Sequence, residues 1–294
     1  MPTSVSGVDL STVSFFTRDP DGDGEVLLPT DLARSSWSTG QVHGVAVSGA
    51  LARAAEQAVA ALGREDLRPV RHSVDLFRAA AMEPFHLSTE VVREGPRLCL
   101  VDVTLTQGGE RVARAAVLFL AGGAAASGET WSPGPQHGRQ PPPLDVAPVT
   151  DEPRVPFVHS DAGWSQRFGD HQNASRKSSW NSAVPVVAGE TLTPFQAVAA
   201  TADGASLVTN WGSEGVQHIN TDITLALARL PRGVEVGLTT IDRVEVDGVA
   251  VGTVAVFDRE GPIGEVVMTS LVNARRSIDF TRLEYDDDGT RHES

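Results

Sequence analysis

Apolar residues along this chain follow two kinds of spacing, and the same order of spacings occurs twice. In the first half they recur every three to four residues over His43–Leu62, which predicts a helix that ends before Gly63. Stretches with strand-like alternation follow, separated by Gly-Pro and Gly-Gly turns. These predicted strands are Ser73–Phe77, Phe85–Val92, Arg97–Gln107 and Arg111–Leu120. The first half is therefore predicted to be one helix followed by an antiparallel meander.

The second half shows the same order of patterns. Leu192–Leu207 has helical spacing, with Thr193 at the N-cap and Pro194 at the first helical position, where proline needs no amide hydrogen. Strand patterns follow near 217–228, 234–246, 249–257 and 262–272. Shifting the first half by 147 residues places Glu56 on Asp203 and Asp75 on Asp222. We therefore predict an α+β protein built from two copies of one helix-plus-meander unit.

Composition changes divide the chain into four parts. Residues 1–121 are predicted to form the first repeat, 122–150 a linker rich in glycine and proline, 151–280 the second repeat, and 281–294 an acidic, disordered tail. Near the N-terminus, Val13–Phe16 and Glu25–Leu28 are predicted to be short strands around a turn at Asp19–Gly24.

Charge and composition narrow the possible partners. The formal net charge of -14 argues against binding to nucleic acid or to anionic membranes, because phosphate groups would be repelled. No apolar run approaches the roughly 18–20 residues that span a bilayer, and the N-terminus lacks the pattern of a signal peptide. We expect a cytoplasmic protein. The single cysteine, Cys99, lies on the apolar face of a predicted strand, so we expect a buried thiol.

The most promising candidate for chemistry is Asp203, a carboxylate at the flank of the second predicted helix. The strand that follows carries Asn220, Thr221 and Asp222. Strand alternation places Asn220 and Asp222 on one face and Thr221 on the other, so Asn220 and Thr221 face the helix together only if the strand is bulged. From the residues alone, a solvated helix carboxylate remains the simpler interpretation of Asp203.

Several strings of the sequence resemble one family. These are HGVAVSGALARAAE (His43–Glu56), VDLFRAA (Val74–Ala80), PVVAGETLTPFQAVAATAD (Pro185–Asp203), HINTDITLALARLPRG (His218–Gly233) and DREGPIGEVV (Asp258–Val267). They resemble the thioesterase-like superfamily, which includes the bacterial type-II acyl-CoA thioesterases. The resemblance implies a double hotdog fold, in which each of two paired units wraps an antiparallel sheet around a central helix.

The resemblance also implies site residues. The family's helix Asp matches Asp203, its strand Thr falls near Asn220 and Thr221, and its Gln on the last strand would fall near Met268 and Thr269, where this sequence has no Gln. The implied function is hydrolysis of an acyl-CoA or acyl-carrier thioester.

In that function Asp203 would be the general base or the nucleophile. Asn220 and Thr221 would orient water or substrate, and Thr269 would partly replace the missing Gln. His43 and Gly44 would present an amide to the acyl carbonyl, while Trp211 and Met268 would contact the substrate.

Other interpretations remain open. The chain could be an acyl-thioester-binding protein without hydrolysis, or a hotdog dehydratase or cyclase acting on a carrier-bound chain. Glu56 could mark a second site in the first repeat, and assembly into homo-oligomers is compatible with the sequence. We expect no cofactor, and no metal, because His218 and Asp222 have no third ligand at a suitable spacing.

Overall fold

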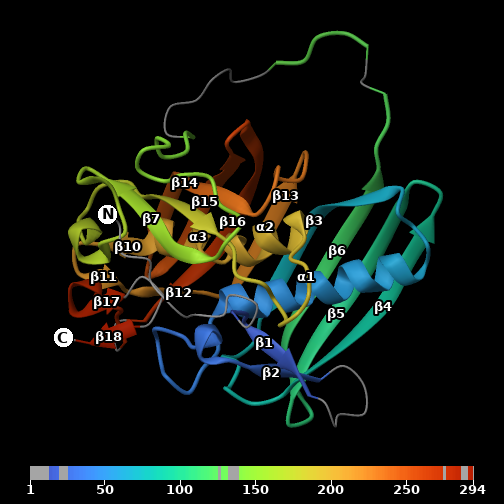
Figure 1. The fold of residues 1–294 in the computed structure, drawn as a ribbon, viewed down its shortest axis with the longest axis horizontal. Coiled ribbons are helices and arrows are strands. Elements are labelled where there is room, and N and C mark those ends of the chain that lie inside the picture. The colour runs from blue at the N-terminus through green and yellow to red at the C-terminus, as the bar shows by residue number, and fades with distance from the viewer. Residues whose placement is uncertain are drawn as a thin grey trace, which may run out of the picture.

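The computed structural model describes residues 13–19, 26–124, 127–131, 139–273, 276–285 and 291–293. The predicted turn at Asp19–Gly24 lies mostly outside these residues, as does part of the predicted linker. Within them, the helices sit against one large curved antiparallel sheet (Figure 1). This arrangement confirms the predicted α+β class and the double hotdog architecture.

The two predicted helices are present, but the second is interrupted. Helix α1 spans Gly44–Ala61 and is capped by His43, whose Nδ1 accepts a hydrogen bond from Ala46 N at 3.0 Å. Helix α2 spans Pro194–Ala202 and is capped by the hydroxyl of Thr193. A separate helix α3 spans Ala205–Asn210. The continuous helix predicted over 192–207 is therefore wrong. Gly204, a weak helix former, stands at the break, which leaves Asp203 at the C-terminal end of α2.

Fourteen strands of the described residues form a single sheet. Its order is β1-β2-β4-β5-β6-β3-β13-β16-β15-β14-β9-β7-β8, with β12 also paired to β16. The first-half strands are β1 Phe16–Arg18, β2 Val26–Pro29, β3 Leu67–Leu76, β4 Phe85–Gly95, β5 Leu98–Gln107 and β6 Glu110–Ala121. The second-half strands are β7 Arg154–Ser160, β8 Gly163–Ser165, β9 Ser178–Ser182, β12 His218–Asn220, β13 Asp222–Leu227, β14 Glu235–Val246, β15 Val249–Asp258 and β16 Gly261–Val272. Between α3 and β12, the short strands β10 Trp211–Gly212 and β11 Gly215–Val216 pair with each other.

The two halves of the sheet join where β3 pairs antiparallel with β13. In this register Asp75 lies opposite Asp222, the two residues that the 147-residue shift superposes. Equivalent residues of two repeats face each other only where an approximate two-fold axis passes between them. The seam therefore places that axis between β3 and β13, and it makes the two halves neighbours in one continuous sheet.

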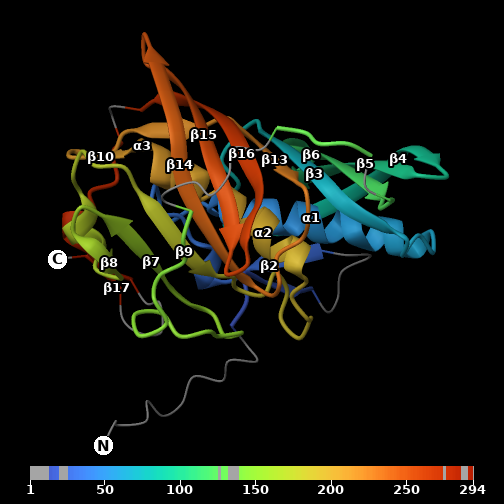
Figure 2. The same cartoon turned by 90° about the horizontal axis from the view of Figure 1, so that it is seen from above.

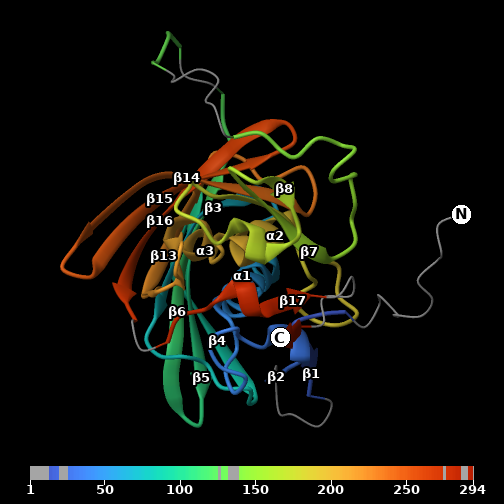
Figure 3. The ribbon, with the colours of Figure 1, turned by 90° about the vertical axis from the view of Figure 1, so that its left-hand side faces the viewer.

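Helices α1 and α2 run antiparallel beneath this seam, and the strands curve around both of them (Figures 2 and 3). Small residues allow a close approach. The Ser48 hydroxyl donates to the carbonyl of Ala199 at 2.6 Å, and a Cβ added to Gly49 would lie 3.3 Å from the Ala200 Cβ. The antiparallel packing brings the start of each helix beside the end of the other.

Several elements were not predicted. Strands β7, β8 and β9 extend the sheet beyond β14, although Ser178–Ser182 has the polar sequence SSWNS. Part of the predicted linker is fixed, since Arg259 donates to the carbonyls of Pro142 and Ala147. The predicted disordered tail contains two paired strands, β17 Leu283–Tyr285 and β18 Arg291–Glu293.

Among the helices of the described ranges, we find none with the length and hydropathy of a membrane-spanning segment.

A buried ion pair ties α1 to the loop before α2. The Arg53 side chain is only 1% exposed, and its guanidinium donates to both carboxylate oxygens of Glu190 at 2.5 and 2.6 Å. Burial acts to raise the pKa of Glu190, but hydrogen bonds from Arg53 and Arg18 outweigh it and hold this pKa below its usual value. The carboxylate therefore stabilises the fold above that pKa, and its contribution is lost as the pH falls through it.

Replacing Glu190 with Gln should remove the carboxylate that binds two nitrogens of the buried Arg53 and destabilise the protein by about 3 kcal/mol at neutral pH. Urea unfolding measures the difference. Glu110→Gln is the matched control, because Glu110 and Arg78 form an exposed pair, for which we expect less than about 1 kcal/mol. The difference between wild type and Glu190→Gln should shrink as the pH falls below the folded-state pKa of Glu190. Equal losses in the two variants would contradict this assignment.

Candidate functional site

Asp203 lies where the end of α2 meets the start of α1. Its side chain is half-buried. It packs directly on Gly44, the first residue of α1, and a Cβ at position 44 would lie within 2.5 Å of both carboxylate oxygens. Only glycine fits at position 44 without displacing the carboxylate. The first-turn amides of a helix have no acceptor within the helix and attract negative charge, so an acid and amide donors stand side by side here.

Asn220, at the end of β12, holds this carboxylate. Its Nδ2 donates to Asp203 Oδ1 at 2.9 Å. Burial raises the pKa of Asp203 above the ordinary value for an aspartate, and the hydrogen bond from Asn220 acts in the opposite direction. Because Asn220 occupies one carboxylate oxygen, Oδ2 is the oxygen left to accept a proton. A carboxylate with a raised pKa is a stronger base than a solvated one.

Thr221 and Thr269 lie apart from Asp203. Strand pairing is interrupted between β12 and β13, and there the Thr221 hydroxyl is 2.8 Å from the Thr269 hydroxyl on β16. Both hydroxyls also bond the carboxylate of Asp222. Thr221 is exposed, on the outer face of the sheet. The structure therefore does not bring these two threonines to Asp203: Asn220 faces inward, whereas Thr221 and the Asp222 carboxylate lie together on the outer face. The prediction that Asn220 and Asp222 share a face is wrong, because alternation is broken between β12 and β13. Asp222, opposite Asp75, belongs to the seam.

Two inward-facing polar residues that we did not predict lie next to Asn220. Ser270 is 2% exposed and is the cross-strand neighbour of Asn220 in the pairing of β12 with β16. Its Oγ accepts a hydrogen bond at 3.0 Å from Asn210, the last residue of α3. Asn210 in turn accepts from Arg243 Nε at 3.2 Å. Alternation from the inward-facing Met268 would have identified Ser270, whereas nothing in the sequence indicated that α3 would deliver Asn210 to it.

The remaining predicted residues have structural partners. The His43 Nε2 lies 2.9 Å from the carbonyl oxygen of Leu32, and burial lowers the pKa of this histidine. Its ring caps α1 and thereby fixes the position of Gly44, the next residue. Met268 is fully buried in the core. Trp211 is 4% exposed and packs on Phe280, with 4.4 Å between ring centroids.

Glu56, the counterpart of Asp203, already has partners. Its carboxylate accepts from the Thr193 hydroxyl and from Gln196 Nε2, both at 2.8 Å. Burial raises the pKa of Glu56, and these two hydrogen bonds oppose the shift. The first repeat therefore uses its helix acid to anchor the start of α2. On β3 of the same repeat, the Ser73 hydroxyl accepts a hydrogen bond from the Thr224 hydroxyl across the seam.

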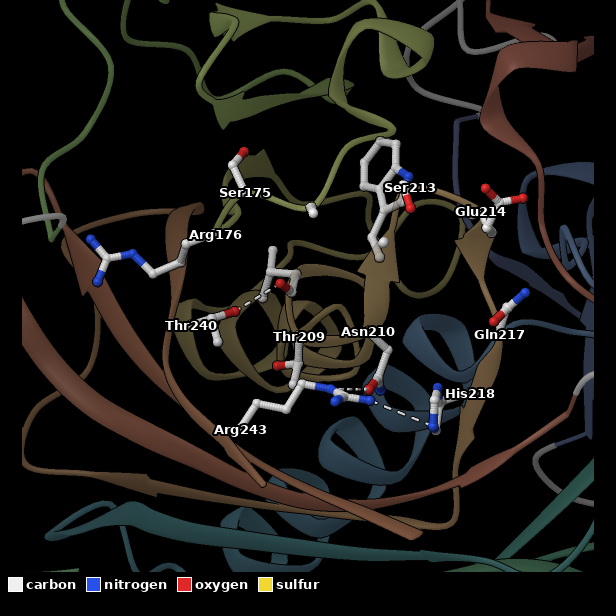
Figure 4. Close-up of a pocket in the computed structure, with 15 residues that line it drawn as sticks. Ser175, Arg176, Thr209, Asn210, Ser213, Glu214, Gln217, His218, Thr240 and Arg243 are labelled. Carbon is white, nitrogen blue, oxygen red and sulfur yellow. Dashed lines mark hydrogen bonds between the residues drawn. The ribbon is translucent and has the colours of Figure 1, made fainter. Parts of the chain in front are cut away.

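A pocket of about 520 Å³ opens at the far end of α3 (Figure 4). Asn210, His218 and Arg243 line its inner part, and Arg176 and Glu214 lie at its edges. Asn210 is thus shared between the pocket and the hydrogen bond to Ser270.

Within the described ranges, no three His, Cys, Asp or Glu residues are grouped closely enough to hold a metal ion.

Comparison with known proteins gives the same fold. Residues 33–120 match the family described as acyl-CoA thioesterase N-terminal domain. No curated protein gives a significant sequence match. Among solved structures, a TesB protein of Mycobacterium avium subspecies paratuberculosis is 13% identical, with a TM-score of 0.62 over 90% of this chain and 98% of its own. A structure from Thermobifida fusca, described as a putative thioesterase II, is 16% identical, with a TM-score of 0.58 over 90% of this chain and 97% of its own.

A third structure, the acyl-CoA thioesterase II TesB2 of Mycobacterium marinum, is 19% identical, with a TM-score of 0.56 over 78% of this chain and 88% of its own. At these identities the structural matches establish the fold. The first repeat thus matches the acyl-CoA thioesterase N-terminal domain family, and the chain as a whole has the double hotdog fold and resembles the type-II acyl-CoA thioesterases.

Proposed function

We propose that the protein hydrolyses an acyl thioester, most simply an acyl-CoA, with Asp203 as general base. The observation that carries this proposal is the position of Asp203. Its carboxylate lies against the first turn of α1, one of its oxygens is held by Asn220, and burial raises its pKa. Carboxylates with a raised pKa cluster at functional sites, and this one also has a specific amide partner and lies at the start of a helix.

The reaction follows from these groups. Asp203 Oδ2 accepts a proton from a water molecule as the water oxygen attacks the thioester carbonyl carbon. Negative charge develops on the carbonyl oxygen, and the amides at the start of α1 donate to it. The C–S bond then breaks, the thiolate leaves and takes up the proton, and the products are a carboxylic acid and a free thiol.

Ser270 and Asn210 supply polar groups where the related enzymes have Gln on the last strand. The Ser270 hydroxyl accepts from Asn210, so its own hydrogen remains available to a water molecule beside Asn220. The amide oxygen of Asn210 accepts a hydrogen bond from Arg243, which fixes the orientation of this side chain. We assign the positioning of water to Ser270 rather than to Thr269, because Ser270 shares the inner face of the sheet with Asn220.

Asp203→Asn should lower the rate of thiol release from a panel of acyl-CoAs by about 10²–10⁴-fold, because the base is lost while the shape is kept. Thr269→Val is the matched control on the outer face of the same sheet, and we expect it to stay within about two-fold of wild type. Equal rates for wild type and Asp203→Asn would show that this residue is not the base.

The same panel separates the alternatives. Tight acyl-CoA binding with no thiol released by the wild type would identify a binding protein. Unsaturated or cyclic products without free acid would identify a dehydratase or cyclase.

Asn220→Ala should move the acidic limb of the pH–rate profile to higher pH. The active form is the carboxylate, so activity rises as the pH increases through the pKa of Asp203. The hydrogen bond from Asn220 lowers that pKa, so its removal raises it. The measurement is kcat/KM against pH for both proteins. A limb that stays in place, or moves to lower pH, would contradict the role given to this hydrogen bond.

Gly44→Ala should reduce activity by about 100-fold or more, because the new methyl group would displace the carboxylate of Asp203 from the start of α1. Folding should be retained, since alanine is the better helix former. Gly40→Ala is the control, because a Cβ there meets nothing within 4 Å. The assay is thiol release together with circular dichroism. Full activity in Gly44→Ala would mean that the close contact is not needed for the reaction.

A further inference from the structure

The pocket at the end of α3 differs from what a long acyl chain requires. Its lining includes the hydroxyls of Ser175, Thr209, Ser213 and Thr240 and the amides of Asn210 and Gln217 (Figure 4). The Thr240 hydroxyl and the Asn210 amide are bonded within the protein, whereas the buried Thr209 Oγ1 has no hydrogen-bond partner among the described residues. An alkyl chain would leave that hydroxyl unpaired, which is unfavourable. Its volume of about 520 Å³ is in the range of small-molecule sites. The lining therefore fits a polar ligand.

Two arginines line the pocket of a protein whose formal net charge is -14. They are Arg176 and Arg243, beside the acid Glu214, and Arg243 also pairs with Glu245 outside the lining. The two guanidinium groups offer an anion positively charged donors at this place.

Arg243 is held so that its guanidinium faces the inner part of the pocket. Its Nε donates to Asn210, and its Nη2 contacts His218 Nε2 at 3.5 Å (Figure 4). Nη2 also donates to Glu245 at 2.6 Å, and Glu245 lies outside the lining. These contacts orient the guanidinium and leave Nη1 to bind a ligand. Arginine suits this task because its planar donors match the oxygens of carboxylates and phosphates.

The pocket is also within reach of the proposed reaction centre. Asp203 lies two residues before the start of α3, Asn210 is the last residue of α3, and the six residues of this helix span about 9 Å. In our proposal a substrate with its thioester at Asp203 extends several bonds along α3 to the pocket. Asn210 connects the two places physically, because it lines the pocket and bonds Ser270.

We propose that this pocket binds an oxyanion of the thioester substrate, with Arg243 as the main contact and Arg176 at the edge. The inference rests on the proposed thioester hydrolysis and adds a substrate class to it. Two parts of a substrate could supply the oxyanion. One is a phosphate of the carrier, as in coenzyme A, and the other is a carboxylate at the far end of the acyl group. The two sources share the chemistry that the pocket recognises.

The test compares three thioesters. Butyryl-CoA carries phosphates on the carrier, glutaryl-pantetheine carries a carboxylate on the acyl group, and butyryl-pantetheine carries neither. The readout is the ratio of kcat/KM for each anionic substrate to that for butyryl-pantetheine. Arg243→Gln should lower every rate, because Asn210 loses its partner, and should lower one of the two ratios by about ten-fold, as expected for a lost charge-assisted hydrogen bond.

Arg176→Gln should lower the same ratio by about two- to five-fold through KM alone, since an exposed charge contributes less. Arg93→Gln removes an exposed arginine of the first repeat and should leave both ratios unchanged. The ratio that falls identifies the source of the oxyanion. Ratios that stay constant in Arg243→Gln, or that fall equally in Arg93→Gln, would overturn the proposal.

A second measurement separates failure of this inference from failure of the proposed function. Calorimetry of free coenzyme A and of glutarate with wild type and Arg243→Gln needs no turnover. If the wild type hydrolyses none of the three thioesters but binds one probe, and Arg243→Gln does not, the pocket assignment stands and the hydrolytic function fails. If neither probe binds the wild type, the pocket assignment fails.

Discussion

The antiparallel pairing of β3 with β13 is the interaction on which the rest of this structure depends. It joins the two repeats edge to edge, so neither repeat leaves these strands as open edges of its sheet. It also sets the two helices antiparallel beneath the seam, and their small residues allow them to pack closely. That packing brings the end of α2 to the start of α1, so the contact between Asp203 and Gly44 follows from how the two sheets are joined.

The duplicated unit uses its two equivalent places differently. In one, Glu56 binds Thr193 and Gln196 and anchors the start of α2. In the other, Asp203 accepts a hydrogen bond from the amide of Asn220 and lies on a glycine. The interruption of the second helix adds to this difference, because it creates α3, and α3 delivers Asn210 to Ser270 and to the pocket. One repeat therefore contributes mainly support, and the other carries the groups we assign to the reaction.

Polar residues at the site are arranged in one continuous series. Arg243 bonds Asn210, Asn210 bonds Ser270, Ser270 lies across from Asn220, and Asn220 bonds Asp203. In our proposal one end of this series recognises the charge of the substrate and the other end moves the proton. A substrate that fills the pocket would thereby also fix the amide and hydroxyl that position water.

The sequence by itself determined the helix-plus-meander unit, its duplication, and the prominence of Asp203, because these depend on local periodicity and on residue type. It left open whether Asn220 and Thr221 face the same way, because a bulge would change the alternation, and the break between β12 and β13 decides this. It did not determine that β7 to β9 extend the sheet, because the polar residues of β9 are buried by partners distant in the sequence. Nor did it decide that Ser270 and Asn210, rather than Thr269, lie beside Asn220. Those placements depend on the register of β16 and on the break at Gly204, which only the packed tertiary structure fixes.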